Sequence, residues 1–311
     1  MKTTKLIRVN IVFAISFCTV FILMVSSCKE LYPITKTAEG YTFEIDENQN
    51  ATLIKTDILA ETIEIPLEIS SYDVKKLGGD RVIGGILFSM TYDGLFEGNS
   101  TVKEIIIPEG VEIVGDQAID SCENLEKIAL PNTLAELQII NCDKLEKVDI
   151  PGSVTSLSLL GCDNLKEINF TDSDMIINDF CFEGSGLESI LLPNRLEKIP
   201  ELAFSGCVQL ETVNIPQSVT SINYSAFEWC TSLVSLELPG NIERIEGCAF
   251  RECSSVEKII IYDKVDYIAD NAFNGCDKLT IYGIKGSYVE QYANEHNIPF
   301  GELDTTYEPT N

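Results

Sequence analysis

Cysteine is the residue type whose spacing first suggests chemistry in this sequence. The chain of 311 residues has 11 cysteines. Seven of them occupy the same place in a recurring phrase, as in SCENLEKIALP and SGCVQLETVNIP. The seven are Cys122, Cys142, Cys162, Cys207, Cys230, Cys253 and Cys276. Such a row could bind a metal, form disulfides, supply a nucleophile or belong to the core.

The reactive roles fit the spacing poorly. A zinc site needs four converging ligands, often with a C-x2-C pair, and this sequence has no such pair and a single histidine, His296. That histidine lies in the closing unit, so a cysteine nucleophile in the repeats also lacks a plausible base. Neighbours in a stacked row lie about 4.8 Å apart, so distance alone does not exclude disulfides, but side chains in a row point the same way. We predict a ladder of free, buried thiols, with no metal, cofactor or catalytic residue.

A second pattern resembles the start of a calcium loop. Asp46, Asn48 and Asn50 stand at the first ligand positions and Asp57 at the twelfth. However, Ala51 occupies the sixth position, where the loop needs glycine for its sharp turn. The flanking stretches alternate between apolar and polar residues, so we predict a hairpin turn at this place instead.

The phrase that contains the cysteines belongs to a long internal repeat. An apolar anchor recurs at steps of 20 to 23 residues. The anchors are Val102, Leu125, Leu145, Leu165, Leu187, Leu210, Leu233, Val256 and Leu279. A proline follows most anchors by six residues and, lacking an N–H, would end a strand at the same corner each time. This period predicts a solenoid in which stacked units share one core.

One unit, VTSINYSAFEWCTSLVSLELP, shows how the elements should be arranged. Leu236 and Leu238 alternate with Glu237, which predicts one short parallel strand per repeat. The segment SAFEWC is too short for a long helix and should form a helical or 3₁₀ turn on the opposite side. Units of 20 residues, such as NTLAELQIINC, lack the Ala-Phe step and should have a shorter turn.

The pattern V..I...AF..C..L..I.IP resembles the BspA-like leucine-rich repeats of bacterial surface proteins over about residues 60 to 300. The resemblance implies an α/β leucine-rich-repeat solenoid and, by family analogy, adhesion to host proteins or to other bacteria. An irregular N-terminal capping unit is expected at 41–100, the solenoid at 101–280, a C-terminal helical cap at 281–303 and a tail at 304–311.

The N-terminus has the features of an export signal. Basic residues precede an uncharged run at 11–25, which is shorter than the roughly 20 residues needed to span a bilayer. Val25-Ser26-Ser27-Cys28 then resembles the lipobox of bacterial lipoproteins. The resemblance implies a signal peptide at 1–27, lipidation of Cys28 and a tether at 28–40. A membrane-anchored signal with an incidental cysteine is the alternative.

The residue after that cysteine bears on location. Lys29 stands where an aspartate would favour retention in the inner membrane, so family analogy implies a lipid anchor in the outer membrane. Exposure at the cell surface is left open.

The overall charge limits the possible partners. The formal net charge is −27, whereas nucleic-acid binding needs basic patches against phosphate, so no nucleic-acid partner is expected. The leading hypothesis is a monomeric, non-enzymatic surface lipoprotein that binds a protein or glycan. The alternatives are an accessory or catalytic component in carbohydrate handling and an envelope scaffold.

The strands offer the clearest candidate surface for binding. Two positions per strand should face solvent, one on each side of the buried middle residue. Extended solenoid faces are the usual binding surfaces of such proteins. The predicted partner-binding residues are the charged Lys127, Lys147 and Lys258 and the apolar Leu191 and Ile260.

Overall fold

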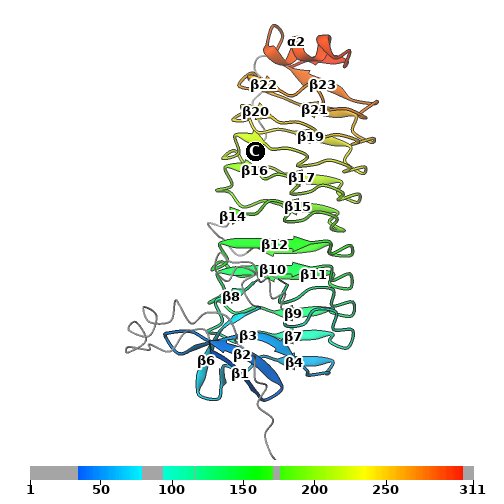
Figure 1. Ribbon diagram of the computed structural model, residues 1–311. Coiled ribbons are helices and arrows are strands. Elements are labelled where there is room, and N and C mark those ends of the chain that lie inside the picture. Colours follow the sequence, from blue (N-terminus) through cyan, green and yellow to red (C-terminus); the bar gives the residue numbers. More distant parts are fainter. Residues whose placement is uncertain (1–33, 79–93, 116, 171–175, 304–311) are drawn as a thin grey trace, which may run out of the picture.

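The computed structural model describes residues 34–78, 94–115, 117–170 and 176–303. They form a parallel β-solenoid with little helix, in which the chain coils up the stack from the N-terminal strands to a C-terminal helix (Figure 1). Within the described residues, no helix has the length and apolar character needed to span a bilayer. The predicted export signal, Cys28 and the tail at 304–311 lie outside the described residues.

Each unit contributes two strands, where the sequence predicted one. The strands after the anchor residues form what we call the front face. They are β4 (Thr62–Glu64), β7 (Glu104–Ile106), β9 (Lys127–Ala129), β11 (Lys147–Ile150), β13 (Glu167–Phe170), β15 (Ser189–Leu191), β17 (Thr212–Asn214), β19 (Ser235–Glu237), β21 (Lys258–Ile260) and β23 (Thr280–Gly283). Their parallel register advances by one whole repeat, as in Ser189 against Thr212 and Ser235 against Lys258.

The second set of strands forms the back sheets. They are β6 (Tyr72–Leu77), β8 (Ile113–Val114), β10 (Glu136–Ile140), β12 (Ser156–Leu160), β14 (Ile176–Ile177), β16 (Lys198–Ile199), β18 (Ser221–Ile222), β20 (Arg244–Ile245) and β22 (Tyr267–Ile268). In units of 23 residues these strands are two residues long. In the 20-residue units β10 and β12 extend to five residues, because the Ala-Phe turn is missing there.

The segments predicted to be helical or 3₁₀ form hydrogen-bonded turns instead. Leu202 and Gly206 have φ angles of 55° and 72°, and left-handed residues at this spacing interrupt any right-handed helix. Alternate amides then bond to the next unit: Phe204 N–H donates to Ala226 at 2.8 Å, while Cys207 N–H donates within the turn to Phe204 at 3.1 Å. The turns therefore also connect the units.

The core is one continuous cluster along the stack. A column of phenylalanines runs through five consecutive units, with neighbouring ring centroids 5.2 to 5.4 Å apart. Its members are Phe182, Phe204, Phe227, Phe250 and Phe273. Tyr292 of the C-terminal helix closes the column edge-on. Stacking thus supplies the buried area that no single unit could supply.

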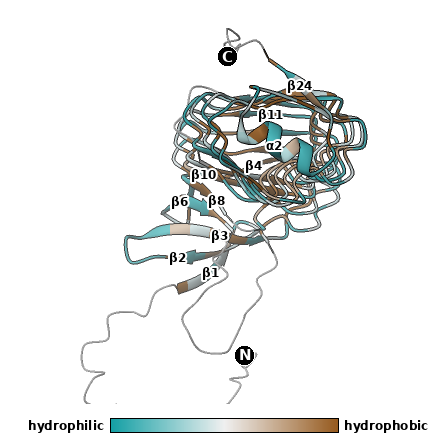
Figure 2. Ribbon diagram, turned by 90° about the horizontal axis from the view of Figure 1, so that it is seen from above, coloured by the Kyte–Doolittle hydropathy of each residue, from teal (hydrophilic) through white to brown (hydrophobic). Residues whose placement is uncertain are grey.

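Both ends of the stack are closed. The antiparallel strands β1 (Ile34–Ala38), β2 (Tyr41–Ile45) and β3 (Asn50–Thr56) continue into the first back sheet, where β5 (Glu68–Ile69) also pairs with β6. β1 lies within the predicted tether, so ordered pairing begins earlier than residue 41. At the other end, α2 (Tyr288–Glu295) covers the last unit, as the end-on view shows (Figure 2), and β24 (Phe300–Glu302) pairs with β23.

Candidate functional site

The front face follows the predicted alternation of buried and exposed side chains. In β17, for example, Thr212 and Asn214 are exposed on either side of the half-buried Val213. Parallel register places equivalent residues of successive units side by side. The face is therefore a regular array of side chains whose chemistry changes from unit to unit.

In the N-terminal half of this face, the polar side chains bond to one another. Lys147 Nζ lies 2.6 Å from Glu167 Oε1 and 3.7 Å from Asp149 Oδ1. Asn169 Nδ2 donates to both Asp149 and Glu167, at 2.7 and 3.0 Å. The hydrogen bond from Lys147 is the main cause of the lowered pKa of Glu167. These groups already have partners within the chain.

A shallow hollow of about 460 Å³ lies further along, over β15, β17 and β19. Ser189, Thr212, Leu191, Asn214, Ser235 and Glu237 line it, together with Ile190, Val213 and Leu236, the middle residues of the three strands. The short side chains of Ser189, Thr212 and Ser235 lie between the longer Glu167 and Lys258 of the flanking strands. This difference in side-chain length produces the hollow.

The hollow combines free hydrogen-bonding groups with an apolar side chain. Within the described part of the chain, the side chains of Ser189, Thr212, Asn214 and Ser235 have no hydrogen-bond partner. Leu191 is 66% exposed beside them. Such a set of unsatisfied polar groups around an exposed leucine is suited to contact with another molecule.

The C-terminal border of the hollow is held by tyrosines. Tyr262 Oη donates to Glu237 Oε1 at 2.7 Å, which fixes this carboxylate at the edge. Lys258 Nζ lies 5.0 Å from the centroid of the Tyr282 ring, on the next strand away from the hollow. The ring attracts the ammonium group electrostatically, so Lys258 is drawn toward the cap.

One predicted contact residue is not exposed. Ile260 is only 4% exposed because it packs in a small cluster with Tyr262 and Leu303. The chain returns after α2 to form β24 and covers this part of the face. The expectation that Ile260 faces solvent was therefore wrong.

The structure does not bring the other predicted residues together at one place. Leu191 lines the hollow and Lys258 flanks it. Lys127 is exposed on β9, separated from β15 by β11 and β13, and Lys147 is exposed on β11 but paired with Glu167. Sequence reasoning missed Ser189, Thr212, Asn214, Ser235 and Glu237. The detectable signal was three short side chains in succession in one outward row.

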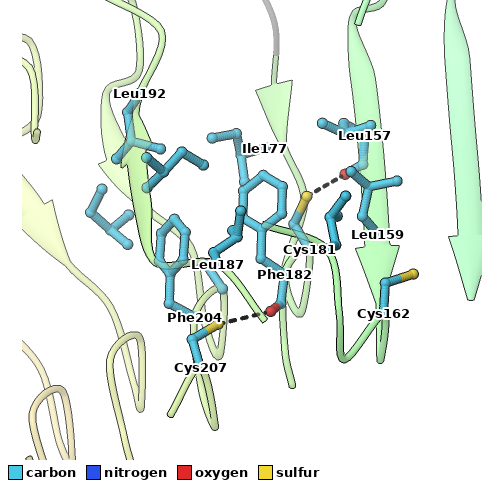
Figure 3. Close-up of a cluster of buried hydrophobic side chains, with 14 of the residues drawn as sticks. Leu157, Leu159, Cys162, Ile177, Cys181, Phe182, Leu187, Leu192, Phe204 and Cys207 are labelled. Carbon is cyan, nitrogen blue, oxygen red and sulfur yellow. Dashed lines mark hydrogen bonds between the residues drawn. The ribbon is translucent and has the colours of Figure 1, made fainter. Parts of the chain in front are cut away.

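The ladder cysteines are free, as predicted, and buried except for the half-buried Cys276. In five units the Sγ donates to the backbone carbonyl of a phenylalanine in the preceding unit, at 3.0 to 3.2 Å (Figure 3 shows Cys207). The five are Cys122, Cys207, Cys230, Cys253 and Cys276. The thiol thus links consecutive units.

In the 20-residue units, the equivalent carbonyl accepts a hydrogen bond from a backbone amide instead of from a thiol. Ile140 N–H donates to Ile119 at 2.9 Å, and the Sγ of Cys142 donates within its own unit to Ile140 at 3.4 Å.

Burial also makes ladder thiols less reactive. It raises the pKa of Cys207 to about 11 and that of Cys162 to about 12. Thiols in this state supply little thiolate for nucleophilic chemistry.

The remaining candidate residues, Asp46 in the calcium-loop pattern and His296, make hydrogen bonds and contacts within the fold. Asp46 Oδ1 accepts from the backbone N–H groups of Asn48 and Asn50, both at 2.8 Å, and closes the predicted hairpin between β2 and β3. His296 ends α2, with Nδ1 2.9 Å from Tyr292 O and Nε2 3.6 Å from Asp270. In the described ranges, no cluster of three His, Cys, Asp or Glu side chains could hold a metal ion.

Residues 90–175 and 158–280 match the family model described as the BspA type leucine-rich repeat region, in six copies. The chain belongs to this family. A search of curated proteins finds no match.

Several solved structures are similar. A leucine-rich cell surface protein from Faecalibacterium prausnitzii is 21% identical, with 84% of this chain and 97% of that chain covered and a TM-score of 0.41. A leucine-rich repeat protein from Bacteroides ovatus is 22% identical, with 86% and 100% covered and a TM-score of 0.42. One from T. pallidum is 18% identical, with 86% and 98% covered and a TM-score of 0.47.

Proposed function

We propose that this protein is a lipid-anchored surface protein of the adhesion type, which binds a protein or glycan partner through the hollow on its front face. The observation that supports this is the set of four unpartnered polar side chains around the exposed Leu191. On β11 and β13, equivalent side chains bond to one another. A monomer is sufficient for this role, because the hollow lies within one chain.

Binding suits the hollow better than catalysis does. Glycoside hydrolysis generally needs two carboxyl groups flanking the scissile bond, and the lining of the hollow has one, Glu237. That carboxylate already accepts a hydrogen bond from Tyr262. Burial raises the pKa values of the ladder thiols Cys162 and Cys207, and none of the ladder thiols lines the hollow.

The anchor in this proposal is the lipid on Cys28, supported by the lipobox-like residues before it. Two or more acyl chains give stable membrane attachment where a single chain is marginal. Mass spectrometry of the mature N-terminus tests the lipid, and protease treatment of intact cells tests surface exposure.

The binding site is tested by filling the hollow. Thr212→Trp places a large side chain between Ser189 and Ser235. Thr220→Trp is the matched control: it lies in the same unit, is exposed, and precedes β18 on the back sheet. Partners are first captured by cross-linking on intact cells that express the wild-type protein, and the capture is then repeated on cells that express each variant. We expect Thr212→Trp to reduce capture at least tenfold and Thr220→Trp to leave it unchanged. Equal capture by both variants would place the binding surface elsewhere.

A further inference from the structure

The charges around the hollow indicate what kind of partner fits it. We infer that the hollow receives an extended, basic segment of a partner protein, with basic side chains at Glu211 and Glu237 and an aliphatic side chain on Leu191. This inference rests on the proposed function of the same hollow and names its occupant.

Two carboxylates, those of Glu211 and Glu237, lie at opposite ends of the strands that form the hollow. Glu211 directly precedes Thr212, is exposed, and has no ion pair within the described residues. Glu237 presents a second carboxylate at the other end of the strands. No lysine or arginine lines the hollow, and Lys258 beside it is drawn over Tyr282. A cationic ligand is therefore favoured, in keeping with the net charge of −27.

The uncharged groups suit a peptide backbone. The hydroxyl groups of Ser189, Thr212 and Ser235 and the amide of Asn214 can each donate and accept. They can therefore satisfy both the N–H and the C=O groups of a chain lying across the strands. Adjacent strands are about 4.8 Å apart, so a segment crossing from β15 to β19 needs about four extended residues.

The apolar contacts also favour a peptide over a glycan. Leu191 is 66% exposed and Val234, next to Ser235, is 49% exposed. Both could pack against aliphatic side chains of a partner. No aromatic ring lines the hollow, so a sugar would have no flat surface on which to stack. The hollow thus offers hydrogen bonds and aliphatic contacts, with the Glu237 carboxylate in its lining and the Glu211 carboxylate next to Thr212.

The test uses a defined probe and matched variants of the full-length protein in detergent. The probe is a fluorescein-labelled peptide with the sequence Arg-Ser-Leu-Ser repeated twice, compared with its Glu-Ser-Leu-Ser counterpart and with a labelled N-acetylglucosamine tetramer. The double variant Glu211→Gln/Glu237→Gln keeps the acceptor for Tyr262 and removes both charges. Glu136→Gln/Glu201→Gln makes the same change in net charge at exposed positions away from the hollow. Circular dichroism checks that each variant is folded.

We expect the basic peptide to bind in fluorescence anisotropy, the acidic peptide to bind at least tenfold more weakly, and Thr212→Trp to abolish binding. The double variant Glu211→Gln/Glu237→Gln should bind the basic peptide about fivefold more weakly than the wild type, because two surface charge pairs are lost. The control double variant should stay within twofold of the wild type. Equal weakening by both double variants would mean general charge attraction and would overturn the inference. So would binding of the oligosaccharide alone.

The two proposals fail in different ways. If Thr212→Trp blocks the partner captured on cells but the basic peptide never binds, the hollow is the binding site and its occupant has been wrongly assigned. If Thr212→Trp leaves the captured partner bound, the hollow is not the site and both proposals are wrong.

Discussion

The stacked phenylalanines should dominate the stability of the C-terminal half, and Phe227→Ala measures their contribution. The ring is fully buried, and its centroid lies 5.2 Å from that of Phe204 and 5.3 Å from that of Phe250, with interplanar angles of 4° and 6°. Truncating a buried phenylalanine to alanine typically lowers the free energy of unfolding by about 3–5 kcal/mol. Each aromatic contact that is lost costs about 0.5–1.5 kcal/mol beyond the loss of buried area.

The neighbours of Phe227 cannot easily close the resulting cavity. Hydrogen bonds fix the turns on both sides, since Phe227 N–H donates to Ala249 at 2.8 Å and Phe204 N–H donates to Ala226 at 2.8 Å. The loss should therefore be near the upper end, about 4–5 kcal/mol. For a chain of this size, that corresponds to a fall in Tm on the order of 10 °C.

Urea denaturation followed by circular dichroism and by tryptophan fluorescence checks this prediction. Trp229 is the only tryptophan and stands two residues after the mutated position. Units of a solenoid can unfold separately, so the two signals together show whether the loss is local or spreads along the stack. Phe180→Ala is the control, because that ring is 43% exposed; we expect a loss below about 1 kcal/mol. If the two variants lose equal stability, the ring column does not stabilise the fold as argued.

Two further predictions concern the repeat itself. Iodoacetamide at pH 8 should label the buried ladder thiols slowly in native buffer and rapidly in denaturant, with Cys276 reacting first because it is half-buried; rapid native labelling of Cys207, or a mass deficit of two per bridged pair, would contradict the ladder. Asp143→Asn should raise the Tm at pH 7 but not at pH 3. Burial and the charges of Asp163 and Glu123 raise the pKa of Asp143, so the ionised form destabilises the fold above that pKa and protonation removes the cost as pH falls. An equal effect at both pH values would refute this reasoning.

The repeat period predicted the core well. Every unit must bury the same face against its neighbours, so the inward positions recur with the period, as Phe227, Cys230, Leu233 and Leu236 illustrate. The back strands were missed because two extended residues between turns, such as Ser221 and Ile222, leave almost no periodic signal. The turns were misassigned because the left-handed residues include Leu202 and Trp229, which do not indicate such a conformation as glycine does.

Contacts outside the repeat pattern were less predictable. Ile260 occupies an outward position in its unit, and only the return of the chain through β24 buries it beside Leu303. Nothing in the period of the repeat encodes that return. The hollow was missed for a different reason: it depends on the relative lengths of side chains in five successive strands and on which of them already have partners.

The inward and outward positions of the repeat are under different constraints, and this difference supports a functional interpretation of the hollow. The fold constrains the inward residues of every unit but requires only solubility and strand propensity of the outward ones. Over β11 and β13, outward residues are polar, three of the four are charged, and they are paired with one another. Over β15, β17 and β19, the side chains of Ser189, Thr212, Asn214 and Ser235 are short and have no hydrogen-bond partner among the described residues, and they surround the exposed Leu191. Surface charge pairs contribute little to stability, so their absence there costs the fold little and leaves polar groups available to a partner.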